Sequence, residues 1–464
     1  MKRHTAAGRK TFKRRRKEVI NLTYQRPMGL FTDLPEEIIQ SILGEYIPLS
    51  SLAVLAQTSK SMCTYIRELA IDSQLIIQPI CKYIVKNWCP RISVYFAHIG
   101  SFLRMASSYL NTKDKLRVLE TFIFTLEESF IEISQKLSLE FAYDCIGLLI
   151  QRFVIKWDDD GLREVFTVIS RLSKLHERLN RVLSVDNPGI LRKFEQDIRL
   201  FVRLVFIEKV SSSDQHCLWL SLLMELFPTQ RARLLFLLYG PTEEVEDEGS
   251  AIVDWYLLAQ CTDYGHFICP YEILKDLADV FTLVSNSERF KWSETAIIRF
   301  FNEITCTPDE WCHENQAKLL FLLGQDMAVK ILQAKLKTNN ISDFAGIAYH
   351  LAQVSSPSSQ ESSPHSLTWF VEVVFKSILV LPAPSSRSYV IAEIFSTWKE
   401  NIQSLTDDLQ DNFILNDFGN LVERWRASVT NLSLLTHLLT EALLSDKPGS
   451  LISCKKLFQH DNGI

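Results

Sequence analysis

The chain has 464 residues, a length that allows two to four domains or one long repeat array. Hydrophobic residues make up 47% and charged residues 23%, which is ordinary for a soluble globular chain. The net charge is −5, but residues 1–17 hold nine Lys or Arg and no acid, so the rest of the chain carries a net charge of about −14 (−5 − 9). This negative charge does not favour nucleic-acid binding by the body of the protein. Gly and Pro number only 15 each, and this scarcity of turn formers favours an all-α fold.

Three further features exclude other classes of protein. No run of 18 apolar residues occurs, so no membrane span is expected. The basic N-terminus is not followed by an apolar stretch, so no signal peptide is predicted. The ten cysteines include no CxxC pair, and they are expected to be reduced thiols rather than a disulfide framework.

The first 30 residues form a polar, basic arm that we expect to be disordered. The arm contains five consecutive basic side chains: Lys13, Arg14, Arg15, Arg16 and Lys17. Such a cluster can bind an acidic importin groove, which favours the nucleus as the location, with the cytoplasm as a second one. Two alternatives stay open, namely contact with nucleic-acid phosphates and a tail whose charges are simply solvated.

Residues 34–66 have the most specific pattern in the chain. Pro35 occupies the first position of a predicted helix, where its missing N–H costs nothing, and an apolar stripe follows on one helical face. Pro48 ends this helix, and two more short helices are predicted, the last holding Met62 and Tyr65. Because about forty residues cannot bury enough surface to be stable alone, the unit must pack on the rest of the chain, on a partner, or on both.

The order Leu-Pro-Glu-Glu-Ile-Ile, then Tyr-Ile-Pro, then a Ser-Leu that leads into Leu-Ala and Thr-Ser-Lys resembles the F-box. The F-box is the adaptor module that docks on the Skp1 subunit of cullin-RING ubiquitin ligases. This chain departs from the pattern by one extra residue, Gly44 or Glu45. The resemblance implies these Skp1-binding residues: Leu34, Pro35, Ile38, Ile39, Ile42, Leu43, Tyr46, Ile47, Leu52 and Leu55.

After this segment the pattern predicts successive amphipathic helices, with apolar residues three and four positions apart. The clearest stretches are 115–137, 161–183 and 190–207. Three aspartates at 158–160 precede the second stretch, where acids suit the positive end of a helix dipole. Asn-Pro-Gly at 187–189 is the predicted turn between the second and third stretches.

A similarity between two segments of the sequence favours a repeat architecture. Residues 232–238 (Ala-Arg-Leu-Leu-Phe-Leu-Leu) match residues 317–323 (Ala-Lys-Leu-Leu-Phe-Leu-Leu) at a separation of 85 residues, and a glycine follows each stretch. This match is consistent with two HEAT-like helical pairs of an α-solenoid.

Two breaks interrupt the helical pattern, an acidic surface loop at 243–248 and a Ser/Pro-rich linker that is too polar to hold a core. The predicted fold is all-α, an N-terminal three-helix F-box followed by an extended α-helical domain of the HEAT-like, solenoid type. The predicted parts are a disordered basic arm (1–30), the F-box (31–72), an α-helical client-binding body (73–354), the linker (355–366), C-terminal helices (367–445) and a tail (446–464).

No motif for catalysis is present: there is no Gly-rich phosphate loop, no HExxH, no GxSxG and no kinase-like set. Cys312-His313 and the group Cys261, His266 and Cys269 are the suggestive Cys/His groupings, and neither supplies four zinc ligands at the usual spacing. We therefore expect no catalytic residue, no metal and no cofactor. The tryptophans are expected to be core anchors, with a binding groove as the alternative for Trp255, Trp292 and Trp311.

Three longer stretches, 231–241, 292–304 and 308–324, together with the F-box resemble the F-box only protein 47 family. The resemblance implies a substrate-recognition adaptor of an SCF (Skp1–cullin–F-box) ligase with a nuclear, germline role in meiotic chromosome behaviour. Such an adaptor is not an enzyme, because it acts by holding a client near the ubiquitin-charged enzyme.

Two other interpretations stay open. The chain can be a non-catalytic α-helical scaffold at chromatin that binds Skp1 without acting in a ligase. A less favoured interpretation is a nucleic-acid binder that acts through the basic arm. The expected partners are Skp1, a cullin-RING ligase through Skp1, and an unknown protein client, with no membrane contact and direct nucleic-acid binding disfavoured.

Overall fold

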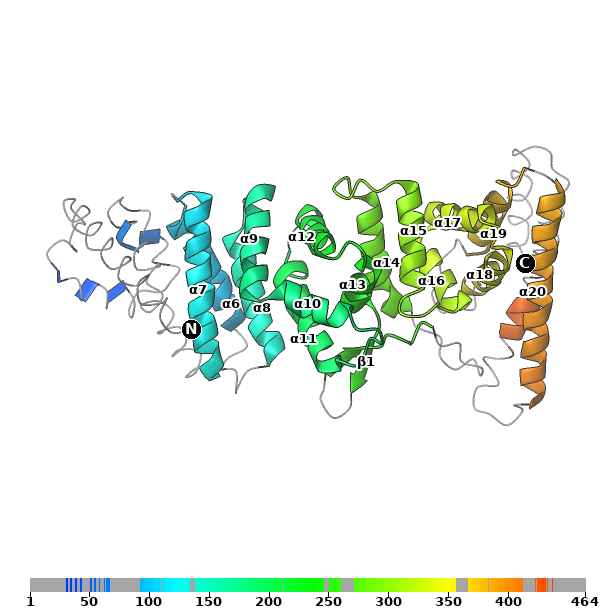
Figure 1. The fold of residues 1–464 in the computed structure, drawn as a ribbon, viewed down its shortest axis with the longest axis horizontal. Coiled ribbons are helices and arrows are strands. Elements are labelled where there is room, and N and C mark those ends of the chain that lie inside the picture. The colour runs from blue at the N-terminus through cyan, green and yellow to red at the C-terminus, as the bar shows by residue number, and fades with distance from the viewer. Residues whose placement is uncertain are drawn as a thin grey trace, which may run out of the picture. The chain divides into compact units, whose positions relative to one another are not determined.

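The structure is a computed structural model of the chain. It describes these residues: 92–108, 110–133, 138–210, 212–245, 250–259, 271–355, 366–382 and 384–411, with scattered positions from 31 to 66 and from 422 to 436. Within them the regular structure is helical apart from one two-stranded sheet (Figure 1). The prediction of an all-α chain with an extended helical domain is confirmed.

The chain forms two compact units. Unit 1 comprises Met1–Ser184 and Asp197–Leu226, and unit 2 comprises Val185–Gln196 and Phe227–Ile464. The boundary between them therefore lies inside the single body that was predicted over residues 73–354.

Unit 1 is built from two layers of helices. Its elements are α6 (Ile92–Ala106), α7 (Thr112–Ile133), α8 (Leu139–Phe153), α9 (Asp159–Leu172), α10 (Leu175–Leu183), the π-helix η3 (Arg203–Ile207) and α12 (Ser213–Leu226). α6, α8 and η3 pack in one layer, while α7, α9 and α12 pack in the other. Aromatic rings join the layers, since the Phe206 ring centroid lies 5.2 Å from that of Phe166 and 5.4 Å from that of Trp219. The core of unit 1 is thus aromatic and continuous across its layers.

Unit 2 repeats this layering more regularly. Its helices are α13 (Arg231–Tyr239), α14 (Tyr271–Asn286), α15 (Glu294–Thr305), α16 (His313–Leu323), α17 (Gln325–Lys337), α18 (Ile341–Val354), α19 (Ser366–Ile378) and α20 (Pro384–Asp411), and α11 (Arg192–Val202) runs across the boundary with unit 1. From α13 onward each helix contacts the next helix but one, so odd-numbered and even-numbered helices form separate layers. This alternation is typical of stacked helical-pair repeats.

Residue types that favour a helix N-terminus start several helices. Asp158 accepts a hydrogen bond from the Gly161 N–H at 2.9 Å and caps α9, as the three aspartates suggested. Ser293 caps α15 in the same way through the Ala296 N–H at 3.2 Å. Pro384 begins α20, in the position where a proline is tolerated.

The helix predicted over residues 161–183 is broken in the structure. α9 ends at Leu172, and Lys174 takes a left-handed conformation with φ of 50° before α10 begins. Both helices bury an apolar stripe. The helical spacing of apolar residues therefore continues through the break, and the sequence pattern does not reveal the break. The prediction of one continuous helix was wrong at this point.

The stretch predicted over residues 190–207 is helical but ends in a π-helix. The Glu208 N–H donates to the Arg203 carbonyl, five residues earlier, at 2.7 Å. The wider turn buries four consecutive side chains, Leu204 to Ile207, which an α-helix would divide between two faces.

Gly189, in the predicted turn before α11, has φ of +87°, a conformation that glycine adopts without strain.

The acidic stretch is a β-hairpin rather than a loop where the structure describes it. β1 (Thr242–Val245) pairs antiparallel with β2 (Ser250–Val253), and Glu243 lies opposite Ile252. Ile252 and Val253 are buried, which explains why the second strand forms although its partner is acidic. The prediction of a surface loop was therefore wrong for residues 243–245, while its remaining residues, 246–248, lie outside the described residues.

The two similar segments, 232–238 and 317–323, lie in two buried helices but do not occupy equivalent repeat positions. Its copies lie in α13 and α16, which belong to opposite layers of unit 2. Leu235 and Leu320 are fully buried in these helices. The likeness therefore reflects a shared demand for burial and not the register of a repeat.

Candidate partner-docking site

The candidate docking site is the F-box-like segment, of which the structure describes separate positions. The Pro35 carbonyl accepts the N–H groups of Ile38 and Ile39, both at 3.1 Å, so a helix begins at this proline as predicted. Thr58 closes a later turn, because its N–H and its hydroxyl both donate to the Leu55 carbonyl, at 3.1 and 2.7 Å. Local hydrogen bonds thus organise the segment at its start and at a turn further on.

The apolar side chains of this segment divide into two sets. Ile39 and Leu43 are 1% and 0% exposed, so the chain itself already covers them. Leu34 and Ile38 are 38% and 47% exposed. The buried pair holds the segment together, and the exposed pair is the part that a partner can contact.

The structure describes only some of the other predicted docking residues. Pro35 is exposed, and Ile42 and Leu55 are half-buried. Tyr46, Ile47 and Leu52 lie outside the described residues, as does the basic cluster Lys13, Arg14, Arg15, Arg16 and Lys17. Sequence reasoning missed Val54, which is 64% exposed next to Leu55. Its position in a predicted helix gave no sign that it faces outward.

The third predicted helix has the expected burial. Met62, Tyr65 and Ile66 are helical and are 3%, 8% and 0% exposed. They anchor the segment, so that its outward face is presented from a packed base.

A polar cluster in unit 2 joins α16 and α18 to the helical positions 424–430. The Lys318 ammonium, 3% exposed, lies 2.9 Å from a Glu314 carboxylate oxygen, and Arg424 lies 3.7 Å from the other oxygen. Burial alone would raise the pKa of Glu314, but Lys318, His350 and Arg424 outweigh it and hold this pKa below its usual value. The carboxylate is therefore ionised when it holds α16 to Arg424.

Ser428 adds a second contact between the same parts. Its hydroxyl lies 2.9 Å from the Tyr349 hydroxyl and accepts the Gln353 side-chain N–H at 2.8 Å. Its carbonyl accepts the Trp398 indole N–H at 3.1 Å. These buried polar contacts fix residues 424–430 against α18 and α20 and serve a structural purpose.

We expect His350 to make unit 2 less stable in acid. Burial lowers the pKa of His350 to about 4, Arg424, His313 and Lys318 act in the same direction, and Glu314 opposes them. Between pH 6.5 and 4 the unfolded chain binds a proton that the folded chain excludes, so stability is lost as the pH falls through this window and is unaffected above it. The full pKa shift corresponds to about 3 kcal/mol of unfolding free energy, and because His350 as a residue is only half-buried we expect about 1–2 kcal/mol.

The measurement is urea denaturation of the wild type and of His350→Gln at pH 7 and pH 4.5. The wild type should lose about 1–2 kcal/mol more than the variant on acidification. His176→Gln, at an exposed position of α10, is the control and should lose as much as the wild type. Equal losses in all three proteins would contradict the role of His350.

The Cys/His groupings gain no support as metal sites. In the part of the chain that the structure describes, no group of three or more His, Cys, Asp or Glu is placed to hold a metal ion. His313 instead lies 3.6 Å from the Asp343 carboxylate, and Cys312 is half-buried. Cys261, His266 and Cys269 lie outside the described residues. None of the helices described is both long and apolar enough to cross a bilayer.

Four tryptophans act as core anchors, as predicted. Trp255 and Trp311 are each 2% exposed, and Trp219 and Trp398 are fully buried. The other tryptophans that the structure describes are half-buried, namely Trp157, Trp292, Trp369 and Trp425, while Trp88 lies outside the described residues.

The layered helical pairs define an α-helical repeat protein, and the N-terminal segment adds a compact helical module with an outward apolar face. A sequence model of the family described as "FBXO47, ARM repeats" matches residues 171–449, which is more than half of the chain. The chain belongs to this family. Its body is accordingly an array of ARM repeats. The contacts between alternate helices agree with this class of repeat.

Curated relatives agree with this assignment. The chain is 24% identical over 405 residues to F-box only protein 47 of Homo sapiens, an alignment that covers 84% of this chain and 86% of the relative. It is 23% identical over 376 residues to F-box only protein 47 of Mus musculus, with 79% of each chain covered. A solved chain from a computationally designed, self-assembling cyclic homooligomer shares 10% identity with a TM-score of 0.15 and supports no structural conclusion. Both relatives are named as F-box proteins, and both alignments cover more than three quarters of this chain.

Proposed function

We propose that this chain is the substrate-recognition adaptor of an SCF ubiquitin ligase. The F-box segment binds Skp1 and, through it, a cullin, while the helical body captures a protein client. The chain does no covalent chemistry, and it acts by raising the effective concentration of client lysines near the ubiquitin-charged enzyme.

The observation that supports this proposal most is the exposure of Leu34 and Ile38 beside the buried Ile39. A short helix with apolar residues on its inner and its outer sides is suited to pack on its own chain and on a partner at once. The names of the human and mouse relatives agree with an F-box protein.

We place the protein in the nucleus, with the cytoplasm as a second location, because the five basic residues at 13–17 suit an importin groove. The family resemblance adds that the clients act in meiotic chromosome behaviour. Deleting residues 1–17 should move a fluorescent fusion out of the nucleus if the basic cluster is the import signal.

A second candidate function uses the same segment differently. A helical scaffold at chromatin would bind Skp1 through Leu34 and Ile38 without recruiting a cullin. The ARM-repeat body favours this alternative as much as the first, because such arrays present long surfaces to partners with or without ubiquitination.

Co-purification from cells separates the two functions. We expect the wild type to bring down both Skp1 and a cullin, and Leu34→Asp/Ile38→Asp to bring down neither, because two charges then face the apolar partner surface. Ile190→Asp is the matched control, since Ile190 is 67% exposed outside the F-box, and it should retain both partners. Recovery of Skp1 without any cullin would contradict the adaptor and favour the scaffold.

A further inference from the structure

The β-hairpin of unit 2 has an outer edge that no further strand covers. Among the strands of the described residues, β1 pairs only with β2. In Figure 1, β1 lies below α13 and has no second strand beside it. A strand at the edge of a sheet presents unpaired backbone N–H and C=O groups, and it is therefore a template on which one more strand can pair.

The register of the hairpin determines which backbone groups face outward. Pro241 and Asp254 form the pair next to the ladder, and the Asp254 N–H donates to the Pro241 carbonyl at 2.9 Å. Hydrogen-bonded and non-hydrogen-bonded pairs alternate along an antiparallel ladder, so Glu243, two residues further on, also bonds inward to β2. The N–H and C=O groups of Thr242 and Glu244 therefore point away from β2.

These outward groups are available to a partner. In the part of the chain that the structure describes, neither Thr242 nor Glu244 makes a backbone hydrogen bond outside the hairpin. Thr242 is half-buried and Glu243 is exposed, so solvent reaches this edge. The edge of β1 can accordingly exchange its bonds to water for bonds to an extended segment of another protein, as in β-strand addition.

The buried side of the hairpin holds this edge in place. Ile252 and Val253 of β2 are 7% and 5% exposed. Trp255, two residues beyond β2, is 2% exposed and stacks on Phe236 of α13 with ring centroids 5.0 Å apart. Because β2 is anchored in the core of unit 2, β1 is already ordered, and a partner that pairs with it loses less conformational entropy.

The charge of β1 selects the kind of segment that can pair with it. The Glu243 side chain is exposed, and it forms no ion pair with any residue that the structure describes. Glu244 follows it in the strand, and the next acids in the sequence are at positions 246–248. Opposite charges on neighbouring strands stabilise their pairing, and like charges directly opposite each other destabilise it. The edge therefore favours a segment that carries Lys or Arg, and it disfavours an acidic segment such as β1 of a second copy.

We propose that the outer edge of β1 binds an extended basic segment of the client protein as a third strand of the sheet. The outward N–H groups of Thr242 and Glu244 donate to client carbonyls, and their own carbonyls accept client N–H groups. Every second client residue faces the same side as Glu243, so a Lys or Arg at such a position lies next to this carboxylate. This inference rests on the proposed function, because it names the surface on which the adaptor captures its client.

A synthetic peptide tests the proposal without knowledge of the client. The probe is a fluorescein-labelled octapeptide of alternating lysine and valine, and its binding to the full chain is measured by fluorescence polarisation. We expect saturable binding that weakens as salt is added, and no binding of the matching glutamate–valine peptide. A lysine–valine peptide that is N-methylated at every residue keeps its charge but has no N–H to donate, so it should bind at least about tenfold more weakly. Equal affinity for the methylated peptide, or no binding of the unmodified one, would overturn the proposal.

Two proline variants test the edge itself. Thr242 and Ala251 both stand in non-hydrogen-bonded pairs of the ladder, so a proline at either position removes no bond between β1 and β2. Thr242→Pro removes an outward N–H from β1, whereas Ala251→Pro removes one from the opposite edge, on β2. We expect Thr242→Pro to bind the lysine–valine peptide about fivefold more weakly than Ala251→Pro. The same affinity in both variants would show that the outer edge of β1 is not the binding site.

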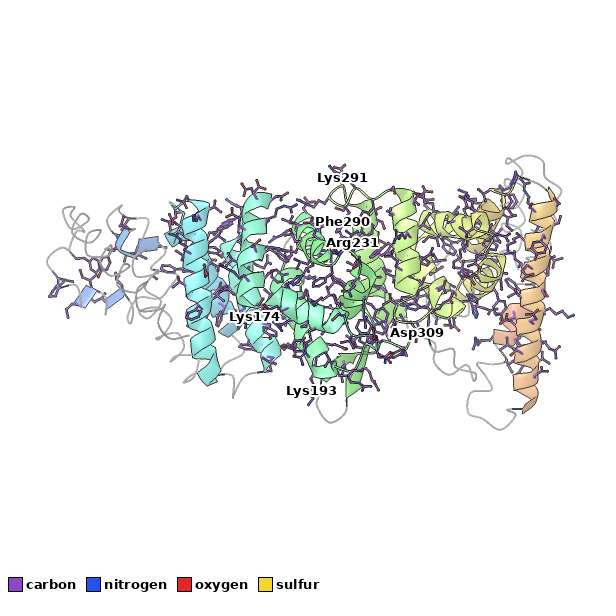
Figure 2. All side chains as sticks on the ribbon, viewed as in Figure 1. Lys174, Lys193, Arg231, Phe290, Lys291 and Asp309 are labelled. Carbon is purple, nitrogen blue, oxygen red and sulfur yellow. The ribbon has the colours of Figure 1, made fainter. Side chains whose placement is uncertain are left out.

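Two charge variants test the basic character of the segment and leave the backbone unchanged. Glu243→Gln removes the exposed carboxylate and keeps its shape. Asp309→Asn makes the same change at an exposed acid in the loop before α16, which Figure 2 labels. Glu243→Gln should bind the peptide about threefold more weakly than the wild type, while Asp309→Asn should bind like the wild type. Equal affinities of these two variants would contradict a basic occupant.

The basic arm of the chain itself is the alternative occupant of the edge. A full-length variant, Arg14→Gln/Arg15→Gln/Arg16→Gln, removes three charges of the arm. We expect this variant to bind the lysine–valine peptide with the affinity of the wild type. Tighter binding by the variant would show that the arm competes for β1, and it would overturn the client as the occupant.

The Skp1 readout separates this inference from the proposed function. Thr242→Pro should still co-purify with Skp1, because Leu34 and Ile38 are unchanged. Skp1 binding by a wild type that does not bind the peptide counts against the strand edge alone. Peptide binding by a wild type that does not bind Skp1 counts against the SCF adaptor and leaves the strand edge in place.

Discussion

Replacing Gly147 with alanine is expected to destabilise unit 1 by about 3 kcal/mol, although alanine is the better helix former. Gly147 lies in α8, where a Cβ would overlap the carbonyl oxygen of Leu204 in η3. The intrinsic preference for alanine contributes about 1 kcal/mol in favour of the variant. Separating two packed backbones costs more than this, because neither can rotate away and the aromatic contacts behind η3 are loosened. Urea denaturation of the variant and the wild type measures the difference.

Gly346→Ala is the matched control for this prediction. Gly346 also lies inside a helix, α18, but the atoms that a Cβ would meet belong to the His313 ring. That side chain is 37% exposed and can turn outward, giving up its 3.6 Å contact with Asp343. We expect a change of less than about 1 kcal/mol. Similar losses in the two variants would show that the close approach of α8 and η3 does not limit stability.

Replacing Glu195 with alanine is expected to cost unit 2 about 3 kcal/mol. The Glu195 carboxylate is 2% exposed and accepts the Trp255 indole N–H at 2.8 Å and the Gly189 N–H at 2.9 Å. Both donors would be left without this acceptor in the interior, and each such loss costs about 1–3 kcal/mol. The half-buried Arg233, whose guanidinium lies over the Trp255 ring, would also lose a nearby anion.

Two variants serve as controls for Glu195. Glu195→Gln has nearly the same shape, but its amide N–H₂ faces the Trp255 N–H, so we expect it to be destabilised as well. Glu303→Ala removes a carboxylate that pairs with an 81% exposed Arg299 at 2.8 Å, and it should cost less than about 0.5 kcal/mol. Tryptophan fluorescence during urea denaturation distinguishes these outcomes, and equal costs for Glu195→Ala and Glu303→Ala would refute the buried role.

Much of the fold follows from features that are local in sequence. The helix start at Pro35, the acidic N-terminus of α9 and the short helix that holds Met62 each depend on residues within one or two turns, and each was predicted from the sequence. The layered solenoid follows from repeated apolar stripes, because each helix with one such stripe must find a neighbouring helix.

The features that sequence reasoning missed depend on tertiary contacts. Lys174 breaks a helix although lysine is an ordinary helix former, so only the packing of α9 and α10 explains its left-handed backbone. The hairpin at β1 forms because Val253 and Ile252 are buried, and no local pattern in the acidic strand signals this.

The candidate docking residues show the same difference between local sequence features and tertiary contacts. The F-box resemblance assigned Leu34, Ile38, Ile39 and Leu43 alike to the Skp1-binding face. In the structure Leu34 and Ile38 are exposed, whereas Ile39 and Leu43 are buried. Periodicity places Ile38, Ile39 and Leu43 in one helical stripe and cannot tell which of these side chains the chain itself covers. Trp292 was expected to be a core anchor, with a groove as the alternative, and only the structure shows that it is half-buried beside Arg231 and Phe290.

The central claim is that the F-box segment binds Skp1 through its exposed apolar pair, and a calorimetric titration of the purified full chain with purified Skp1 tests it most directly. We predict a saturable one-to-one complex that Ile190→Asp retains and Leu34→Asp/Ile38→Asp weakens by about a hundredfold or more, since each anchor contributes about 1–2 kcal/mol. A complex of unchanged affinity in the double variant, or no complex with the wild type, would contradict the claim.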